Sequence, residues 1–284
     1  AFDVGGRILE NLGLVWVFFM PAILLAVFWV LDFFIVRNSP LEAGQGDFNT
    51  GDATSGDEGP RMGAKAVFKK MLTNPIILTI AGVEFCSGFL RQAIMQWYGS
   101  FAKQTDAVLG LKSSFVNENW GLMLFAAGVL GGMFAGTISD HVFQSRRGPV
   151  AGVLYGIMLI GAIVLTFTYT TPIVGWLVVF MSMAVIGVHG MLSGTASMDF
   201  GGSKNAGIAV GIIDGFVYLG TGVMSLTYAI ILPKVQLDDV GHIIGPATDP
   251  ANWKAWPLAM IPVAALGFIL ALRLWNAKPK PKSA

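Results

Sequence analysis

The feature that most limits the fold is a series of seven apolar stretches, each long enough to cross a lipid bilayer. About twenty consecutive apolar residues span the hydrocarbon core as a helix. The seven stretches cover residues 14–34, 75–101, 120–138, 149–169, 174–193, 206–232 and 256–275. Hydrophobic residues make up 54% of the 284 and only 12% are charged, a composition outside the range of water-soluble domains. The sequence therefore predicts an all-α, polytopic membrane protein with seven transmembrane helices.

The positive charges outside these stretches fall into two unequal groups when alternate loops are counted. Twelve lysines and arginines lie on the side of the long loop and the C-terminus, and five lie on the other side. Because cytoplasmic loops are enriched in Lys and Arg, we expect the chain to start outside and to end in the cytoplasm with the basic tail "AKPKPKSA". The net charge of +1 gives no indication of a nucleic-acid partner.

One long loop separates the first stretch from the other six. Residues 37–74 are rich in Gly, Asp, Ser and Thr before they turn basic, which predicts a flexible cytoplasmic linker. Its basic end, "RMGAKAVFKK", either forms an amphipathic helix on anionic headgroups or stays solvated. Since the first residue is not Met and the number of stretches is odd, we expect the chain to be a fragment of a longer protein.

Ionisable residues occur inside only some of the stretches. A charge at mid-membrane costs a few kcal/mol or more, so it persists where it faces protein or water. Glu84 and Arg91 lie in the second stretch, His189 in the fifth and Asp214 in the sixth, whereas the first, fourth and seventh have no ionisable residue in their middle. This pattern separates helices that face lipid from helices that face a polar interior.

Arg91 is the strongest candidate for a binding residue. It stands near the middle of its stretch, stays charged at any physiological pH, and carries a fork of donors that matches carboxylate or phosphate. The alternative is an ion pair with Glu84, which lies seven residues away on the same helix face, or with a residue on another helix. Gln92 and Gln96 flank that face, so they are candidate contacts to the same ligand.

His189 and Asp214 are candidates for moving a proton or cation. His189 is either a proton carrier, since an imidazole can gain and lose a proton in the physiological pH range, or a helix-packing group. Asp214 is predicted to take part in coupling, with pairing to a basic residue as the alternative. "HGMLSGTAS" places His189 and Ser193 on one face, but the stretch lacks the other features of a nucleophile site. The sequence therefore predicts no enzyme, and neither a metal-ligand cluster nor a cofactor motif is present.

The loop "GTISDHVFQSRRG" combines small, acidic and basic residues at fixed spacing on the predicted cytoplasmic side. Gly136 is expected to let two helix ends approach, and Asp140 to cap a helix or pair across the helix boundary. Arg146 and Arg147 can bond to helix carbonyls or to a carboxylate. Together with Gly148 these residues predict a latch that joins two helices and can be released.

Three segments resemble one family of transporters: "FLRQAIMQW", "SDHVFQSRRG" and "KNAGIAVGIIDGFVYLG". They are similar to motifs of the organophosphate:phosphate antiporter family of the major facilitator superfamily, which includes glycerol-phosphate and hexose-phosphate transporters and a related sensor. The resemblance implies that the seven helices correspond to helices six to twelve of a twelve-helix fold. Residues 1–36 would then be the last helix of the N-terminal bundle, and residues 75–284 the C-terminal six-helix bundle with its basic tail.

The resemblance also implies a function. It predicts a secondary transporter in the plasma membrane, the inner membrane in bacteria, that moves phosphorylated sugars or related organic anions by alternating access. Arg91 aligns with the family's phosphate-binding arginine, and Gln92, Gln96, Tyr218 and His189 become candidate substrate contacts. The expected partners are a small organic anion or phosphate ester, inorganic phosphate or a proton as coupling ion, the bilayer, and an N-terminal bundle that this chain does not contain.

Some positions depart from the family pattern. Gln92 stands where the family often has Tyr or Thr, and Gln96 stands where it often has Asp. Asp214 stands where the family has a small residue. These changes leave the substrate and the coupling open: phosphate exchange is one alternative, and a different organic anion with proton or cation symport is the other, with Asp214 and Glu84 as coupling candidates. Two alternatives remain open, namely a membrane receptor that senses a phosphosugar and a transporter of an uncharged solute.

Overall fold

The computed structural model describes residues 2–37, 42–46, 64–196 and 206–277. Most of the predicted linker, the start of the third family-like segment at Lys204, and the basic tail from Lys278 lie outside these ranges. The chain forms two units, which are considered one at a time.

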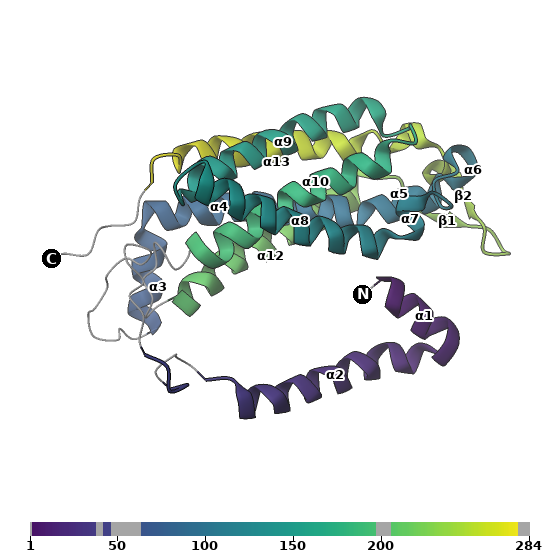
Figure 1. The fold of residues 1–284 in the computed structure, drawn as a ribbon. Helices are drawn as coiled ribbons and strands as arrows, with labels where there is room; N and C mark the ends of the chain where they lie inside the picture. Colours follow the sequence, from purple (N-terminus) through teal and green to yellow (C-terminus); the bar gives the residue numbers. More distant parts are fainter. Residues whose placement is uncertain (1, 38–41, 47–63, 197–205, 278–284) are drawn as a thin grey trace. The chain divides into compact units, whose positions relative to one another are not determined.

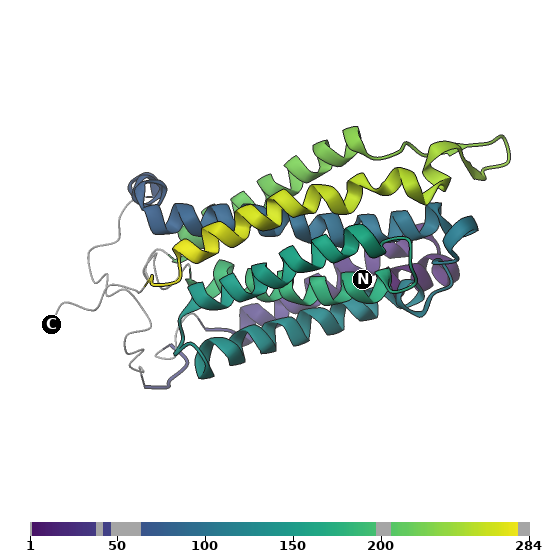
Figure 2. The same cartoon turned by 90° about the horizontal axis from the view of Figure 1, so that it is seen from above.

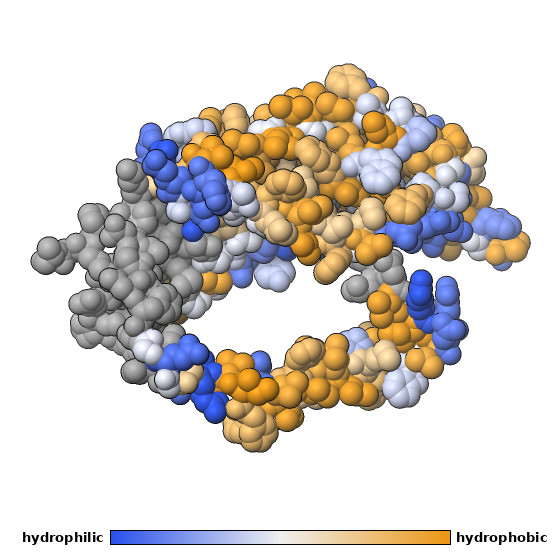
Figure 3. All heavy atoms as spheres, viewed as in Figure 1, coloured by the Kyte–Doolittle hydropathy of each residue, from blue (hydrophilic) through white to orange (hydrophobic). Residues whose placement is uncertain are grey.

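The first unit consists of two helices, α1 (Phe2–Leu12) and α2 (Leu14–Ile35). They meet at Gly13, whose φ of 89° lies in the left-handed region that favours glycine. The α2 helix matches the first predicted stretch, and its most apolar window has a mean hydropathy of 2.6. Figure 3 shows apolar residues along most of its length, as expected for a helix in contact with lipid.

The second unit carries the other helices (Figure 1). They are α3 (Ala64–Thr73), α4 (Pro75–Met95), α5 (Trp97–Gln104), α6 (Asp106–Leu109), α7 (Phe115–Glu118), α8 (Trp120–His141), α9 (Arg147–Thr168), α10 (Val174–His189), the π-helix η2 (Gly190–Ala196), α12 (Ala206–Ile231) and α13 (Ala255–Arg273). Between α12 and α13 lie an antiparallel pair of two-residue strands, β1 (Gln236–Leu237) and β2 (Ile243–Ile244), and the 3-10 helices η4 (Gly245–Thr248) and η5 (Pro250–Trp253).

Seven helices of the described chain are long and apolar enough to cross a membrane. They coincide with the seven predicted stretches, so the prediction of an all-α, polytopic membrane protein is confirmed. Two stretches are interrupted: the second turns at Gln96, between α4 and α5, and the fifth continues from α10 into η2. Figure 3 shows apolar residues over the middle of this unit and hydrophilic ones gathered near its ends.

The α4 helix is central to the packing of the second unit, with α12, α13 and α10 along it (Figures 1 and 2). It starts where the Asn74 side chain accepts hydrogen bonds from the N–H groups of Ile76 and Ile77, and Pro75 occupies the first turn. The α13 helix runs antiparallel to α4: Trp256 near the start of α13 donates a hydrogen bond of 2.8 Å to the carbonyl of Ala93 near the end of α4. The α9 helix is joined to α4 by Tyr155, whose hydroxyl donates to the carbonyl of Val83.

The contact between α4 and α12 is set by two glycines. A Cβ atom at Gly88 would clash with the backbone carbonyl of Val217, and one at Gly220 would clash with the carbonyl of Phe85. The two helices run parallel, since Ile77 near the start of α4 packs with Ala209 near the start of α12. Small residues allow such close approach in lipid, where dispersion forces between backbones hold helices together.

Candidate functional site

A buried carboxylate on α4 is bonded to a histidine on α10. The Glu84 side chain is fully buried, and its Oε2 lies 2.8 Å from Nδ1 of His189, whose side chain is 25% exposed. Glu84 therefore has a partner on another helix, and the alternative ion pair between Glu84 and Arg91 is absent from the described structure. His189, predicted as a substrate contact or proton carrier, is placed next to a carboxylate.

A second polar contact lies one turn further along the same segment. The hydroxyl of Ser193, in the π-helix η2, donates a hydrogen bond of 2.5 Å to Oδ1 of Asp214 on α12. Short π-helical segments occur often at functional sites, where the wider turn re-aims side chains. Here η2 directly follows His189, so one continuous segment, α10 with η2, bonds to Glu84 through His189 and to Asp214 through Ser193.

Glu84 and Asp214 lie at the same level of the bundle. Glu84 is four residues before Gly88, and Asp214 is three residues before Val217, the residue that Gly88 contacts. Because α4 and α12 run parallel, both carboxylates lie about one turn to the same side of this contact. These contacts join the second, fifth and sixth stretches through polar side chains, while the prediction that they face a common polar interior stays a prediction.

Arg91 lies on the other side of the glycine contact. Its side chain is partly exposed, and its guanidinium makes no hydrogen bond or ion pair with any residue in the described ranges. Gln92 is also partly exposed, Gln96 is exposed in the turn after α4, and Tyr218 on α12 is 69% exposed. Within the same ranges, no hydrogen bond joins the side chains of these three residues to Arg91, and their role as ligand contacts stays a prediction.

Metal binding has no support from the side chains that the structure places. Among the described residues, no group of three or more His, Cys, Asp and Glu side chains is arranged to hold a metal ion.

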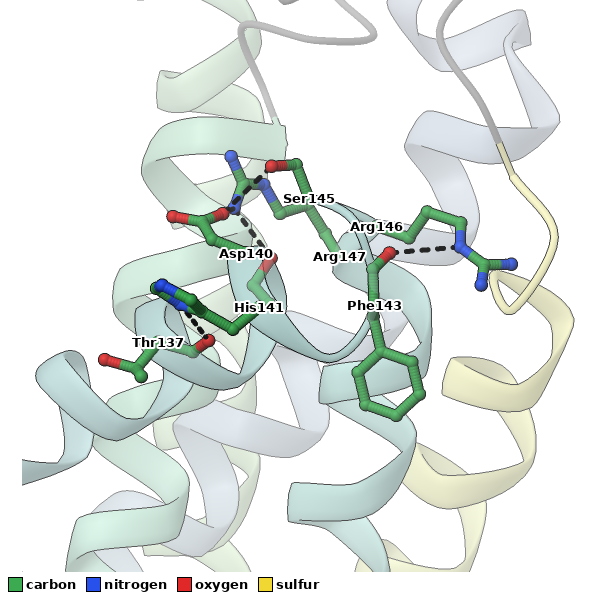
Figure 4. A network of polar contacts seen from close by, with 8 residues as sticks. Thr137, Asp140, His141, Phe143, Ser145, Arg146 and Arg147 are labelled. Atoms are coloured by element: carbon green, nitrogen blue, oxygen red, sulfur yellow. Dashed lines mark hydrogen bonds and ion pairs between the residues drawn. The ribbon is translucent and has the colours of Figure 1, made fainter.

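The loop between α8 and α9 carries a compact polar network (Figure 4). Nη1 of Arg147 donates to the hydroxyl of Ser139 at 2.8 Å and lies 3.5 Å from Oδ1 of Asp140. The Ser145 hydroxyl donates to the same carboxylate at 3.0 Å, and Nε of Arg146 donates to the carbonyl of Phe143 at 3.1 Å. The end of α8 and the start of α9 are thus joined by side chains, while release of this latch stays a prediction.

The two glycines of the loop behave differently from each other. A Cβ at Gly136 would meet no described atom within 4 Å, so the described residues show no close approach of two helix ends at Gly136, and its role there stays a prediction. The close approach occurs at Gly148, where a Cβ would clash with the backbone carbonyl of Leu274 after α13. Gly148 therefore fixes the start of α9 against the end of α13, because only a hydrogen fits between the two backbones.

Ser139, Gln144 and Ser145 were not predicted from the sequence. Gln144 and Ser145 have φ angles of 53° and 62°, in the left-handed region that non-glycine residues seldom adopt. Ser139 is buried and accepts from Arg147. All three lie within the family-like segment "SDHVFQSRRG", but the sequence of that segment does not predict their contacts, since each role depends on the tight turn between the two helices.

Comparison with known proteins supplies independent findings. The sequence model of the Major Facilitator Superfamily matches residues 4–225. A probable hexose phosphate transport protein of Chlamydia pneumoniae is 30% identical over 219 residues, which cover 75% of this chain and 43% of that protein. The glycerol-3-phosphate transporter of Bacillus subtilis (strain 168) is 26% identical over 298 residues, covering 97% of this chain and 62% of the relative. The membrane sensor protein UhpC of Escherichia coli (strain K12) is 26% identical over 232 residues, or 78% of this chain and 46% of the sensor. The chain thus spans about half the length of these relatives.

Proposed function

The chain belongs to the major facilitator superfamily, and on that premise we propose that it is part of a secondary transporter for phosphorylated sugars or related small organic anions. Residues 75–284 supply one six-helix bundle, residues 1–36 supply the last helix of the other, and the C-terminus lies on the cytoplasmic side of the plasma membrane. The names of the hexose phosphate and glycerol-3-phosphate relatives support this class of substrate.

The observation that carries the proposal is the state of Arg91. The acidic residue on its own helix face, Glu84, is bonded to His189, which leaves the guanidinium without a protein partner in the described ranges. A permanent charge in a transmembrane helix requires water or a counter-charge. A phosphate or carboxylate group supplies that counter-charge, and it accepts two parallel hydrogen bonds from the guanidinium fork.

Gln92, Gln96 and Tyr218 complete the proposed binding surface. All three have exposed or partly exposed polar side chains on α4, at its end, or on α12. Amide and hydroxyl groups bind the uncharged hydroxyls of a sugar or glycerol moiety without adding charge. Arg91 would then recognise the anionic group, and these three residues would distinguish one organic anion from another.

The α8–α9 loop is suited to open and close during alternating access. The side chains of Asp140 and Arg147 are 55% and 20% exposed, so their ion pair is weak, on the order of 0.2–1 kcal/mol. A pair of this strength holds one conformation and still breaks at small cost when the bundles rock about the bound anion. Gly148, packed on Leu274, would keep α9 and α13 moving together.

Uptake into vesicles tests this function. The full-length protein is reconstituted, and uptake of glycerol 3-phosphate and glucose 6-phosphate is compared between the parent, Arg91→Lys and the control Arg273→Lys, in the last turn of α13. Losing one charge-assisted hydrogen bond, about 1.5–3 kcal/mol, should weaken binding by about 10–150-fold in Arg91→Lys only.

Each competing function has its own result in this experiment. Binding of the probes without flux would favour a sensor. Uptake by Arg91→Lys that equals the parent would refute the role of the guanidinium fork. Neither binding nor uptake of the two phosphate esters by the parent would favour a transporter of uncharged solutes.

A further inference from the structure

Anion binding at Arg91 does not account for the buried pair on the neighbouring turns. The Glu84 side chain is fully buried in the bundle and that of His189 is mostly buried. Four residues after His189, Ser193 bonds to Asp214, so the α10–η2 segment contacts both carboxylates. We propose that the Glu84–His189 pair is a proton-carrying site linked to Arg91, so that the protein takes up a proton together with its anion. This inference rests on the function proposed above, and it selects proton symport over exchange with phosphate.

The surroundings of Glu84 allow a proton to be gained or lost. Oε2 contacts His189, while Oε1 is buried and has no hydrogen-bond partner among the described residues. An ionised carboxylate is usually stabilised by several hydrogen-bond donors, whereas Glu84 has a single contact, to the His189 imidazole. The carboxylate is therefore poorly stabilised in its ionised form. The His189 ring is 25% exposed, which gives the pair a route to the surface for the proton.

The groups that face the pair come from every helix packed around α4. The α12 helix contributes Asp214, and α4 itself contributes Arg91 and the thiol of Cys86. From α9 comes the Tyr155 hydroxyl, which is neutral near pH 7 and donates to the Val83 carbonyl. At this level α13 contributes the apolar side chain of Leu270, which touches Gly82. Among these described residues, the charged side chains near the pair at neutral pH are therefore those of Asp214 and Arg91.

These two charges have opposite effects on proton binding. Arg91 repels a proton from the pair, and Asp214 attracts one. When an anion binds to Arg91, it cancels the positive charge, so the pair holds a proton more tightly. Linkage is reciprocal, and a protonated pair must strengthen anion binding by the same factor. The sign of this coupling gives symport, since proton and anion bind together and leave together.

The size of the coupling follows from the spacing. Seven helical residues separate Glu84 from Arg91 by about 10.5 Å along the axis. Two unit charges at that distance, with an effective dielectric constant of about 20, change a binding constant by about tenfold. The anion should therefore bind about tenfold more tightly when the pair is protonated.

The test measures the pH dependence of anion affinity. Binding of glycerol 3-phosphate to the full-length protein in detergent is measured at several pH values between about 5.5 and about 7.5, a range centred on the unperturbed pKa of an imidazole. The variants are Glu84→Gln, His189→Gln and the control Glu118→Gln, an exposed carboxylate at the end of α7. Ionisation of the probe is the same for all proteins, so only differences between variants report on the pair.

The parent and Glu118→Gln should gain about tenfold in affinity at low pH beyond the change seen in Glu84→Gln. Vesicles should take up protons with glycerol 3-phosphate in the parent but not in Glu84→Gln. Equal pH dependence of affinity in the parent and Glu84→Gln would overturn the proton site. If Arg91→Lys lost binding in that same case, the proposed anion-binding function would still stand. As a readout that needs no probe, the ¹⁵N resonances of His189 should titrate differently in Glu84→Gln, and identical titration would equally overturn the inference.

Discussion

The glycine contact between α4 and α12 gives a prediction with opposite signs at two positions of one helix. A Cβ at Gly220 would clash with the carbonyl of Phe85, which belongs to a helix backbone and cannot move alone. A Cβ at Gly211, nine residues earlier in α12, would meet no described atom within 4 Å. The change Gly220→Ala should therefore destabilise the protein, and Gly211→Ala should stabilise it.

The magnitudes follow from two competing effects. Overpacking at Gly220 costs about 1–3 kcal/mol, because α12 and α4 must separate. In a helix, alanine is favoured over glycine by about 0.5–1 kcal/mol, which offsets part of that cost. The net change is a loss of about 0.5–2 kcal/mol for Gly220→Ala and a gain of about 0.5–1 kcal/mol for Gly211→Ala. For a domain of this size these values correspond to a melting temperature about 1–8 °C lower and about 1–4 °C higher, respectively.

The single cysteine of the chain supplies the assay. Cys86 lies on α4 within the bundle and is fully buried, so a fluorogenic maleimide reacts with it only after the helices separate. Heating the detergent-solubilised protein with this dye yields a melting curve for each variant. If both substitutions shift the curve in the same direction, or if Gly220→Ala melts at the parent temperature, the close contact between α4 and α12 is wrong.

Three further predictions test other parts of the structure. Tyr155→Phe removes the hydroxyl that donates to the Val83 carbonyl, so the free energy of unfolding should fall by about 0.5–1.5 kcal/mol in the same melting assay. Gln144→Gly should raise it by about 1 kcal/mol, because φ is 53° there, whereas Ser145→Gly should gain less since it loses the hydrogen bond to Asp140. In the β1–β2 hairpin, hydrogen bonds from the N–H groups of His242 and Val240 lower the pKa of Asp238 below its usual value. A lowered pKa stabilises the folded hairpin at pH values above the usual pKa of an aspartate, and this contribution is lost as pH falls through the folded-state pKa. Relative to an Asp238→Asn variant, the His242 amide should therefore exchange more slowly at about pH 5 than at about pH 2.5, once intrinsic rates are divided out. No change in that ratio with pH would contradict the carboxylate's role.

The positions of the membrane helices could be predicted from the sequence to within a few residues. The bilayer sets a minimum apolar length, and the ends of each stretch are marked by polar or charged residues. The α10 helix illustrates the limit, because the stretch 174–193 was expected to be one regular helix. The helix changes from α10 to η2 after His189, where the segment bonds to α4 and α12, and apolar length does not report such contacts.

The candidate site could be predicted in its members but not in its pairing. Glu84, Arg91, His189 and Asp214 stand out because ionisable residues are costly in lipid. Glu84 and Arg91 share a helix face, which allowed a pair between them as an alternative, yet Glu84 bonds to His189, 105 positions away in the chain. Local spacing determines which residues share a helix face. The packing of α10 against α4 determines which residue becomes the hydrogen-bond partner of Glu84.

The central claim is that the Arg91 guanidinium holds the anionic group of the substrate, and a distance between the two tests it most directly. Solid-state NMR of the full-length protein, with ¹⁵N-labelled arginine and bound glycerol 3-phosphate, measures the separation of phosphorus from guanidinium nitrogen. The account predicts a ¹⁵N–³¹P distance of about 4 Å, as in a hydrogen-bonded Arg–phosphate pair, and its loss in Arg91→Lys. Binding of the phosphate with no such coupling, or a coupling that persists unchanged in Arg91→Lys, would contradict it.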